Sequence, residues 1–537
     1  MRARKTSPSC GIDRMRISWV ILALIAILAV PFLLKPKENL LARADDTVVI
    51  VTPHNEAIRF EFSRAFGEHY QKLTGRTVRI DWRMPGGTSE IARYLKSEFY
   101  TVFQNAWTSS GESWTAEVAG AFDNPRIKLP DTPDADTPAQ AARRAFLSST
   151  RGIGIDIFFG GGAYDFIQQA DAGRLVDSGI LQRHPEWFTE ESLPQTVSGE
   201  PYYDKQGRWI GAVLSAFGIC YNSDSLRRLG LKEIPAQWTD LGRPEFFGEV
   251  ALADPTKSGS AAKAFEMIIQ QQMQIVGEER LDDGWARGLN IIQAASANAR
   301  YFTDAAGRVP MDVSNGDAAI GMSIDFYARF QSEAVQIGDQ PSRLQYFTPA
   351  GGSSVGVDPI GLLRGAPNAE VARHFIDYVL SIEGQKLWNY RVGTPGGPVK
   401  YALRRLPARK ELYQPEHMAF FSDPTVFPYE EAKLFTYHPA WTASLFRTLS
   451  FIIRVSNLDP HDEQVAAWRA LIDAKFPLEA TTKFFDVSAV SYRIAQDKIR
   501  PILNSADRIE EVRLARELGE HFRAQYREAE RLAREGK

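Results

Sequence analysis

VALADPTKSGSAAKAFEMII, residues 250–269, is the stretch that decides the fold of this chain. Its first four residues are apolar and predict a buried strand, and the proline and glycine between Asp254 and Ser260 predict a turn. Apolar side chains then recur on one face of a helix from Phe265 to Val276. The chain therefore passes from a strand directly into the N-terminus of a helix.

This turn also has the chemistry of an anion site. The first backbone N–H groups of a helix lack partners and carry partial positive charge, so Ser258, Gly259 and Ser260 offer amide and hydroxyl donors to an anion. Gly259 lets a ligand approach the backbone closely. A serine before a helix is also the ordinary N-cap, and Ser258 therefore has a second interpretation that needs no ligand.

Composition narrows the classes of function. The chain has 537 residues, 44% hydrophobic and 24% charged, as in a globular protein of two or three domains. Its 63 Lys and Arg nearly balance its 66 Asp and Glu, and no basic patch is interleaved with aromatics, so we expect no nucleic-acid partner. Cys10 lies on the expected cytoplasmic side of the apolar run 17–34 and Cys220 in an apolar strand, so we expect no disulfide, and two isolated cysteines do not suffice for a thiolate metal cluster. We expect no metal and no cofactor.

The N-terminus carries a targeting signal. A positively charged start, Arg2 to Arg16, precedes an uncharged apolar run from Ile17 to Leu34 that is long enough to span a membrane. The charge predicts that the N-terminus stays in the cytoplasm while the rest is exported to the periplasm. Residues 1–45 are thus a signal peptide or an uncleaved anchor in the inner membrane. Ala42-Arg-Ala44 has the form of a cleavage site but lies far from the apolar run, so both alternatives stay open.

From residue 46 onward, strands and helices alternate. TVVIVT (47–52) and IGIDIFF (153–159) predict strands that are each followed by a helix, and Gly160, Gly161 and Gly162 form the second connection. Ligands bind at the carboxyl ends of the strands in open α/β sheets, so these glycines are candidates for close ligand approach. A turn that only lets strand and helix pack is the alternative. A Pro- and Asp-rich patch predicts an inserted loop at about 105–149.

Two crossings divide the folded part into lobes. WIGAVLSAFGICYN (209–222) is long enough to pass from one lobe to the other, and VGVDPIGLL (355–363) is predicted to cross back. The expected parts are lobe 1 (46–214), lobe 2 (215–350), a return crossover with lobe-closing helices (351–400) and a helical C-terminal extension (401–537). The last helix, Ile509 to Glu535, is highly charged, with Ile509, Val512 and Phe522 as its sparse apolar side.

Several stretches together resemble a known family. The most distinctive pair is LADPTKSGS (252–260) followed by SIEGQKLW (381–388). VIVTPHNEAIRFEF (49–62) and GDAAIGMSIDFYARF (316–330) also match, and the order of these stretches along the chain is part of the resemblance. They resemble the extracellular solute-binding proteins of ABC importers, family 1 and its ferric-iron-binding-protein-like group. The resemblance implies an α/β, two-lobed periplasmic-binding-protein fold of type II that closes on its ligand by hinge motion. It also implies a monomer that works with permease and ATPase subunits.

The resemblance places twelve residues at the cleft between the lobes. They are Thr52, His54, Asn55, Glu56, Gly161 and Gly162 from lobe 1, Ser258, Gly259, Ser260, Asp325 and Tyr327 from lobe 2, and Asp358 near the return crossover. His54 and Asn55 also suit a helix cap, Tyr327 suits core packing, and Asp358 suits a turn. A carboxylate at Asp325 is either buried with a partner or faces the cleft, and we expect the cleft.

The class of ligand is inferred by comparing the candidate residues with those that ferric iron needs. The iron-binding relatives use an adjacent tyrosine pair, whereas this chain has Phe326 and Tyr327 at the matching positions, so one phenolate is lost. The remaining donors favour a small phosphorylated, phosphonate or carboxylated solute whose hydroxyls or amine donate to Asp325. Ferric-iron binding is the alternative, and a ligand-sensing subunit of a membrane signalling system is another. No enzyme motif is present, and we expect no catalysis.

Overall fold

The computed structural model describes residues 44–133, 136–338, 340–505 and 507–537. The chain falls into two units, residues 1–46 and 47–537, and the account below concerns the second. The expected membrane segment, residues 17–34, and its use as a signal peptide or anchor lie outside the described residues. Within the described ranges, no helix combines the length and the apolar character needed to cross a membrane.

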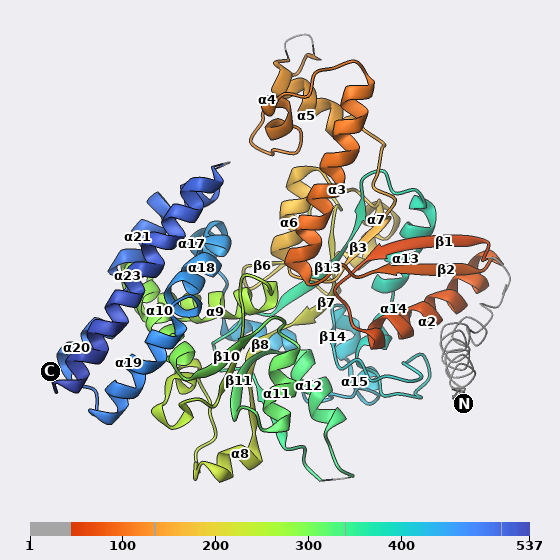
Figure 1. Ribbon diagram of the computed structural model, residues 1–537. Coiled ribbons are helices and arrows are strands. Elements are labelled where there is room, and N and C mark those ends of the chain that lie inside the picture. The colour runs from red at the N-terminus through yellow and green to blue at the C-terminus, as the bar shows by residue number, and fades with distance from the viewer. Residues whose placement is uncertain (1–43, 134–135, 339, 506) are drawn as a thin grey trace, which may run out of the picture. The chain divides into compact units, whose positions relative to one another are not determined.

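The first sheet has seven strands, with the order β14–β7–β13–β3–β1–β2 and β4 paired to β13 (Figure 1). β1 and β3 are parallel, whereas β13 is antiparallel to β3 and β7. The strands are β1 (Asp46–Val51), β2 (Val78–Arg83), β3 (Ile157–Phe159), β4 (Leu175–Val176), β7 (Ile210–Ser215), β13 (Gly356–Leu363) and β14 (Leu406–Pro407). Their helices are α2 (Glu56–Thr74), α3 (Thr88–Ser109), α6 (Ala163–Ala172), α7 (Ile180–Arg183), α13 (Ala369–Leu380) and α14 (Ile382–Asn389).

The second sheet repeats this plan with five strands in the order β10–β9–β11–β8–β12. β9 is parallel to β10 and β11, and β8 is antiparallel to β11 and β12. The strands are β8 (Phe217–Asn222), β9 (Val250–Ala253), β10 (Ala299–Thr303), β11 (Ile320–Ile324) and β12 (Leu344–Phe347). The helices are α8 (Ser223–Arg228), α9 (Gly259–Val276), α10 (Leu281–Ala297), α11 (Arg308–Asn315) and α12 (Asp325–Ala334).

Two connections join the sheets. β7 ends at Ser215 in the first sheet and β8 begins at Phe217 in the second, so the apolar run 209–222 crosses between them as the sequence predicts. The chain returns between the end of β12 at Phe347 and the start of β13 at Gly356. A small hairpin of β5 (Thr196–Val197) and β6 (Glu200–Pro201) precedes the first crossing. The α/β architecture with two sheets is therefore confirmed.

The segment 105–149 is not the loop expected from its prolines. It contains the end of α3, then α4 (Ala116–Ala121) and α5 (Pro138–Ser148), which lie beyond the far end of α3 (Figure 1). Thr137 caps α5, and its hydroxyl accepts a hydrogen bond from the N–H of Gln140. Apolar side chains stabilise the pair of helices, because Phe122 stacks on Phe103 of α3 and Phe146 packs edge-on against both rings. The expectation of a loop was wrong because these aromatics build a small core of their own.

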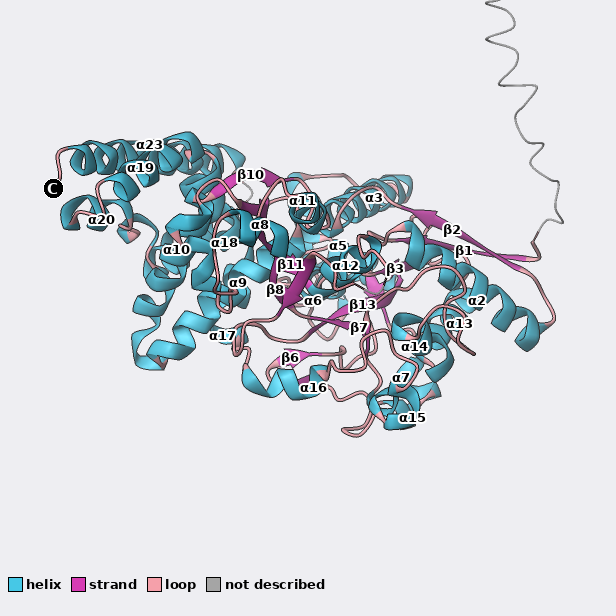
Figure 2. Ribbon diagram, turned by 90° about the horizontal axis from the view of Figure 1, so that it is seen from below, coloured by secondary structure: helices cyan, strands magenta, loops and turns pink. Residues whose placement is uncertain are grey.

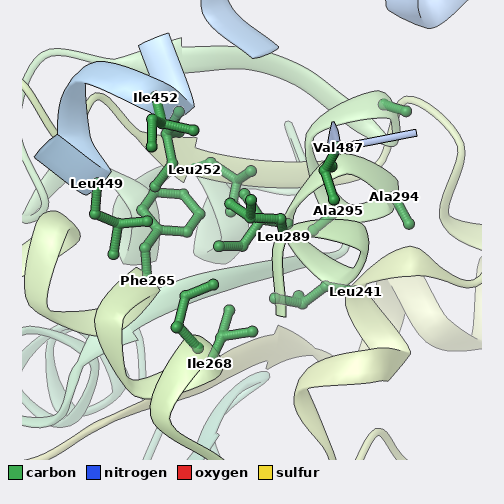
Figure 3. Close-up of a cluster of buried hydrophobic side chains, with 14 of the residues drawn as sticks. Leu241, Leu252, Phe265, Ile268, Leu289, Ala294, Ala295, Leu449, Ile452 and Val487 are labelled. Carbon is green, nitrogen blue, oxygen red and sulfur yellow. The ribbon is translucent and has the colours of Figure 1, made fainter. Parts of the chain in front are cut away.

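The C-terminal region, residues 401–537, has two parts. Residues up to about 432 lie beside the first sheet, where Leu403, Leu406 and Ala432 join its core, and contain α15 (Pro415–Met418) and α16 (Pro428–Glu431). The later helices extend the core of the second sheet: Figure 3 shows Leu449 and Ile452 beside Phe265. These helices are α17 (Pro439–Thr442), α18 (Phe446–Ile453), α19 (His461–Asp473), α20 (Leu478–Phe484), α21 (Tyr492–Ile494), α22 (Arg500–Leu503) and α23 (Arg508–Arg534).

The apolar side of α23 differs from the one expected. α23 packs against α19 and α20, and the three helices lie together in Figures 1 and 2. The side chains of Ile509 and Val512 are 72% and 68% exposed, so two of the three residues expected on the apolar side were wrong. The buried side is a stripe with near-helical spacing: Leu514, Leu518, Phe522, Tyr526, Ala529 and Ala533.

Candidate functional site

A cavity of about 510 Å³ lies where the two sheets face each other, and its walls are turns at the carboxyl ends of strands. β1, β2 and β3 contribute from the first sheet, and β9, β10 and β11 from the second. The lining residues are Pro53, His54, Gly86, Gly87, Thr88, Glu90, Gly161, Lys257, Ser258, Gly259, Ser260, Asp304, Ala305, Ala306, Gly307, Phe326, Tyr327 and Asp358. We call it the ligand cavity. It contains seven of the twelve residues that the sequence places at the cleft.

Six helix N-termini surround the ligand cavity, those of α2, α3, α6, α9, α11 and α12. Four of these helices carry their own acid in the first turn: Glu56 in α2, Glu90 in α3, Asp165 in α6 and Asp325 in α12. The first turns of α9 and α11 contain none. Their partial positive charge is therefore not offset by an acid of the same helix, and it faces the cavity.

The turn before α9 is built by its own sequence. The Asp254 carboxylate accepts hydrogen bonds from the backbone N–H and the hydroxyl of Thr256, at 2.8 and 2.7 Å. Ser258 is the N-cap, and its hydroxyl accepts from the N–H of Ala261 at 3.2 Å. The two interpretations of Ser258 are thus compatible, since it caps the helix and also lines the cavity. The N–H groups of Gly259 and Ser260 have no partner within the helix.

The glycines after β3 allow close packing around the cavity. Gly160 and Gly161 have φ angles of +88° and +120°. A Cβ atom at Gly160 would lie 2.5 Å from the ring of His54, and one at Gly161 would lie 2.3 Å from the side chain of Thr88. Gly161 lines the ligand cavity, whereas Gly162 lines an adjoining cavity. For Gly161 the close packing considered from the sequence is found, and close approach of a ligand stays a prediction.

Arg405 stands behind the cavity wall and was missed by the sequence analysis. Its side chain is fully buried and donates hydrogen bonds to the Asp358 carboxylate, to Ser215 Oγ at 2.9 Å and to His54 Nε2 at 3.2 Å. Its guanidinium also lies 3.9 Å from the centre of the Phe326 ring. Arg405 thus ties His54 and Asp358 of the ligand cavity to Ser215 of an adjoining cavity, and the Phe326 ring takes part as a cation–π partner.

Burial and Arg405 set the charges of this wall. Burial, assisted by the positive charges of Arg405 and Arg59, holds the pKa of His54 well below its ordinary value. A neutral His54 that accepts at Nε2 carries its proton on Nδ1, and this atom has no hydrogen-bond partner among the described residues. Burial raises the pKa of Asp358, although Arg405 opposes the shift. The wall is therefore close to neutral, and two of its buried donors, His54 Nδ1 and Arg405 Nε, have no hydrogen-bond partner among the described residues.

Three expected site residues stand outside the cavity lining. Thr52 is fully buried, and its hydroxyl accepts from the backbone N–H of His54 at 3.1 Å, so it shapes the turn. Asn55 caps α2 by accepting from the N–H of Ile58 at 3.1 Å. Glu56 is exposed in the first turn of α2.

Asp325 is also outside the lining. Its side chain is fully buried, with one oxygen accepting from the N–H of Phe326 at 2.8 Å and the other 3.6 Å from the Arg329 guanidinium. Burial raises the pKa of Asp325 to about 6, against the opposing charge of Arg329. The structure thus places it in the buried, partnered arrangement rather than facing the cleft. Tyr327 does line the cavity, and burial raises its pKa.

Contacts between the lobes bring the cavity walls together. A Cβ atom at Gly87 of lobe 1 would lie 3.4 Å from the Lys257 carbonyl of lobe 2. One at Gly259 would lie 3.5 Å from a carboxylate oxygen of Asp165, which belongs to lobe 1. Asp165 is 9% exposed, and burial raises its pKa to about 7. The lobes therefore meet at the N-terminus of α9.

This burial predicts a pH effect. Because the pKa of Asp165 in the folded protein lies above that of an unfolded aspartate (about 3.9), protonation stabilises the fold fully below about pH 4 and is lost as pH rises through about 7. Between pH 5 and 7 we expect the wild type to lose on the order of 1 kcal/mol per pH unit relative to Asp165→Asn. Urea unfolding of both proteins measures it. Parallel stability curves would show that Asp165 is solvated.

Sequence comparisons agree with this architecture. Residues 154–416 match the family model described as bacterial extracellular solute-binding protein. An uncharacterized protein of Haemophilus influenzae is 27% identical over 233 residues, 43% of this chain and 60% of the relative. The phosphoglycerate transport regulatory protein PgtC of Salmonella typhimurium is 26% identical over 207 residues, 38% of this chain and 47% of the relative. The matches thus span less than two thirds of these relatives.

Solved structures give weaker similarities. The periplasmic binding protein AfuA from Actinobacillus pleuropneumoniae, with fructose-6-phosphate bound, has 18% identity and a TM-score of 0.45, covering 68% of this chain and 86% of AfuA. Iron-bound HitA from Pseudomonas aeruginosa has 18% identity and a TM-score of 0.45, covering 76% and 99%. The family match includes β7 and β8, which join the two sheets, and the turn before α9, which lines the ligand cavity. Residues 154–416 of this chain are therefore similar to the bacterial extracellular solute-binding proteins.

Proposed function

We propose that the protein is the solute-binding component of an ABC importer and that it captures a small anionic solute in the ligand cavity. It acts in the periplasm, as a monomer, and delivers the solute to permease and ATPase subunits. Residues 17–34 direct its export and either hold it at the inner membrane or are removed. The observation that carries the choice of ligand is the pair of helix N-termini, α9 and α11, that face the cavity without an acid in the first turn.

The charges around the cavity support an anion. Every acid among the described lining residues has a partner: Asp304 is bonded to Lys257, Asp358 to Arg405, and Glu90 to the N–H of Gly87. By contrast, the first amide donors of α9 have no partner within the helix, and His54 Nδ1 has no hydrogen-bond partner among the described residues. An anionic oxygen would satisfy these donors, and such charge-assisted hydrogen bonds are the stronger kind.

The name of one relative supports the proposed ligand class. The name of PgtC refers to phosphoglycerate transport. A phosphorylated carboxylic acid has oxygens for the N-termini of both α9 and α11. We therefore place phosphorylated small molecules ahead of phosphonates and simple carboxylates as the solute.

A single charge at Ser260 tests the proposal. Ser260 lies in the first turn of α9 and lines the cavity, and an aspartate there suits the helix while it repels an anion. We expect Ser260→Asp to weaken phosphoglycerate binding at least tenfold in isothermal titration calorimetry. Ser260→Asn, of nearly the same size, retains most of the affinity.

Two results would contradict this function. One is equal affinity of Ser260→Asp and Ser260→Asn for every anion that binds. The other is a rise of the unfolding midpoint with ferric citrate and with none of phosphate, phosphoglycerate and methylphosphonate, since a ligand of the native state raises that midpoint. The second result would favour the iron-binding alternative, with Tyr327 as the phenolate.

A further inference from the structure

A second chamber, of about 130 Å³, adjoins the ligand cavity. The two share Gly259, Ser260 and Asp358 in their linings, so the N-terminus of α9 stands between them. The chamber is walled by α6, the β5–β6 hairpin and the crossover strands. Its last wall is the C-terminal segment 437–446, which lies outside the family match. We call it the inner chamber.

Four aromatic side chains of the described chain line the inner chamber: Tyr164, Phe217, Tyr437 and Phe446. The rings of Tyr164 in α6 and Phe446 in α18 lie 4.4 Å apart between centroids, so they close one side by direct contact. A chamber of this lining favours an apolar or aromatic group over a solvated one.

Buried polar residues on one face of α9 hold the C-terminal segment in place. Tyr437 Oη donates to Glu266 at 2.9 Å, and the amide of Gln270 donates to Thr442 at 2.7 Å and to the His438 carbonyl at 2.8 Å. The Gln270 oxygen accepts from the His438 N–H at 2.9 Å. Such satisfied networks fix a unique geometry, and the segment is therefore a built wall of the chamber.

The charges beside the chamber divide into a paired group and one acid without a partner. Lys263 lies 3.0 Å from Glu200 and 2.9 Å from Glu266, and its ammonium lies 3.6 Å from the centre of the Tyr437 ring. This cation is therefore not available to an anionic ligand. Asp165 also lines the chamber, next to Gly259, and no described side chain forms a hydrogen bond or ion pair with it.

We propose that the inner chamber receives a ring-sized apolar group of the solute, which the C-terminal segment encloses. This proposal rests on the proposed function for the anionic group at α9. An apolar cavity of about 150 Å³ binds benzene, so a chamber of about 130 Å³ has the size for one ring. Asp165 at the junction accepts from a hydroxyl or ammonium group between ring and anion. The solute class is thus an arylalkyl or branched-alkyl phosphate or carboxylate with a donor beside the ring.

Filling the chamber tests the proposal. Ala443 lines it, and Ala443→Phe places a side chain where the ring would lie, whereas Ala443→Ser leaves the volume nearly unchanged. In the full-length protein we expect phenyl phosphate to bind at least tenfold more tightly than methyl phosphate, because a buried ring adds apolar area. Ala443→Ser retains this ratio, and Ala443→Phe reduces it to about one while methyl phosphate binds as before.

A neutral probe separates this inference from the proposed function. Benzene is expected to raise the unfolding midpoint of the wild type and of Ala443→Ser but not of Ala443→Phe. If benzene binds in this pattern and no phosphate does, the chamber stands and the anion function fails. If methyl and phenyl phosphate bind equally and benzene has no effect, the chamber inference is overturned while the anion function stands.

Discussion

Arg405→Met is expected to lower the free energy of unfolding by about 3–5 kcal/mol and to abolish capture of the anionic solute. Arg405 is fully buried, and its removal leaves the Asp358 carboxylate buried without its cation. A bare carboxylate in the cavity wall also repels an anion. Chemical unfolding and calorimetric titration with phosphoglycerate measure the two effects separately.

A paired variant provides the control. Arg405→Met combined with Asp358→Asn removes both charges, so no buried ion is left alone, and we expect most of the stability to return. A loss below about 1 kcal/mol in the single variant would mean that water reaches Asp358 and that Arg405 is not its essential partner.

Phe522→Ala is expected to lower the free energy of unfolding by about 3–5 kcal/mol. Phe522 is fully buried in the stripe of α23 that faces α19 and α20, and truncation leaves a cavity in the core. This core is continuous with that of the second sheet. The loss is therefore expected in the main unfolding transition, which calorimetry or circular dichroism in urea can follow.

Val512 in the same helix is the matched control. Its side chain is 68% exposed, and Val512→Ala is expected to change stability by less than about 0.5 kcal/mol. A separate early transition in Phe522→Ala would contradict the shared core and would show that the C-terminal helices unfold by themselves. Equal effects of the two substitutions would mean that the side of α23 that carries Phe522 is not the buried side.

The sequence predicts the parts of the site that depend on local pattern. The strand, turn and helix of residues 250–269 are found where expected, because an apolar strand, a Pro-Gly turn and a serine cap act over a few residues. The same holds for the crossing strand 209–222 and the glycines after β3. These signals need no knowledge of distant contacts.

The parts that the sequence did not predict depend on contacts across the chain. Arg405 bonds His54 from 351 positions away, and nothing in the residues around it marks a buried arginine. Asp325 has the position of a cleft residue, but Arg329 one helical turn later gives it a buried partner. On α9, the helical spacing of Lys263, Glu266 and Gln270 is a signal of a polar face that the sequence analysis did not use.

The contact between Tyr164 and Phe446 bears on the rate at which a bound solute leaves the cleft. α6 belongs to the first lobe, while α18 is packed into the core of the second, so the opening of the cleft that the proposed function requires would pull these two rings apart. The contact thus adds to the barrier for opening even where it adds little to the final affinity. We expect the residence time of the solute, set by its dissociation rate, to depend on the C-terminal segment.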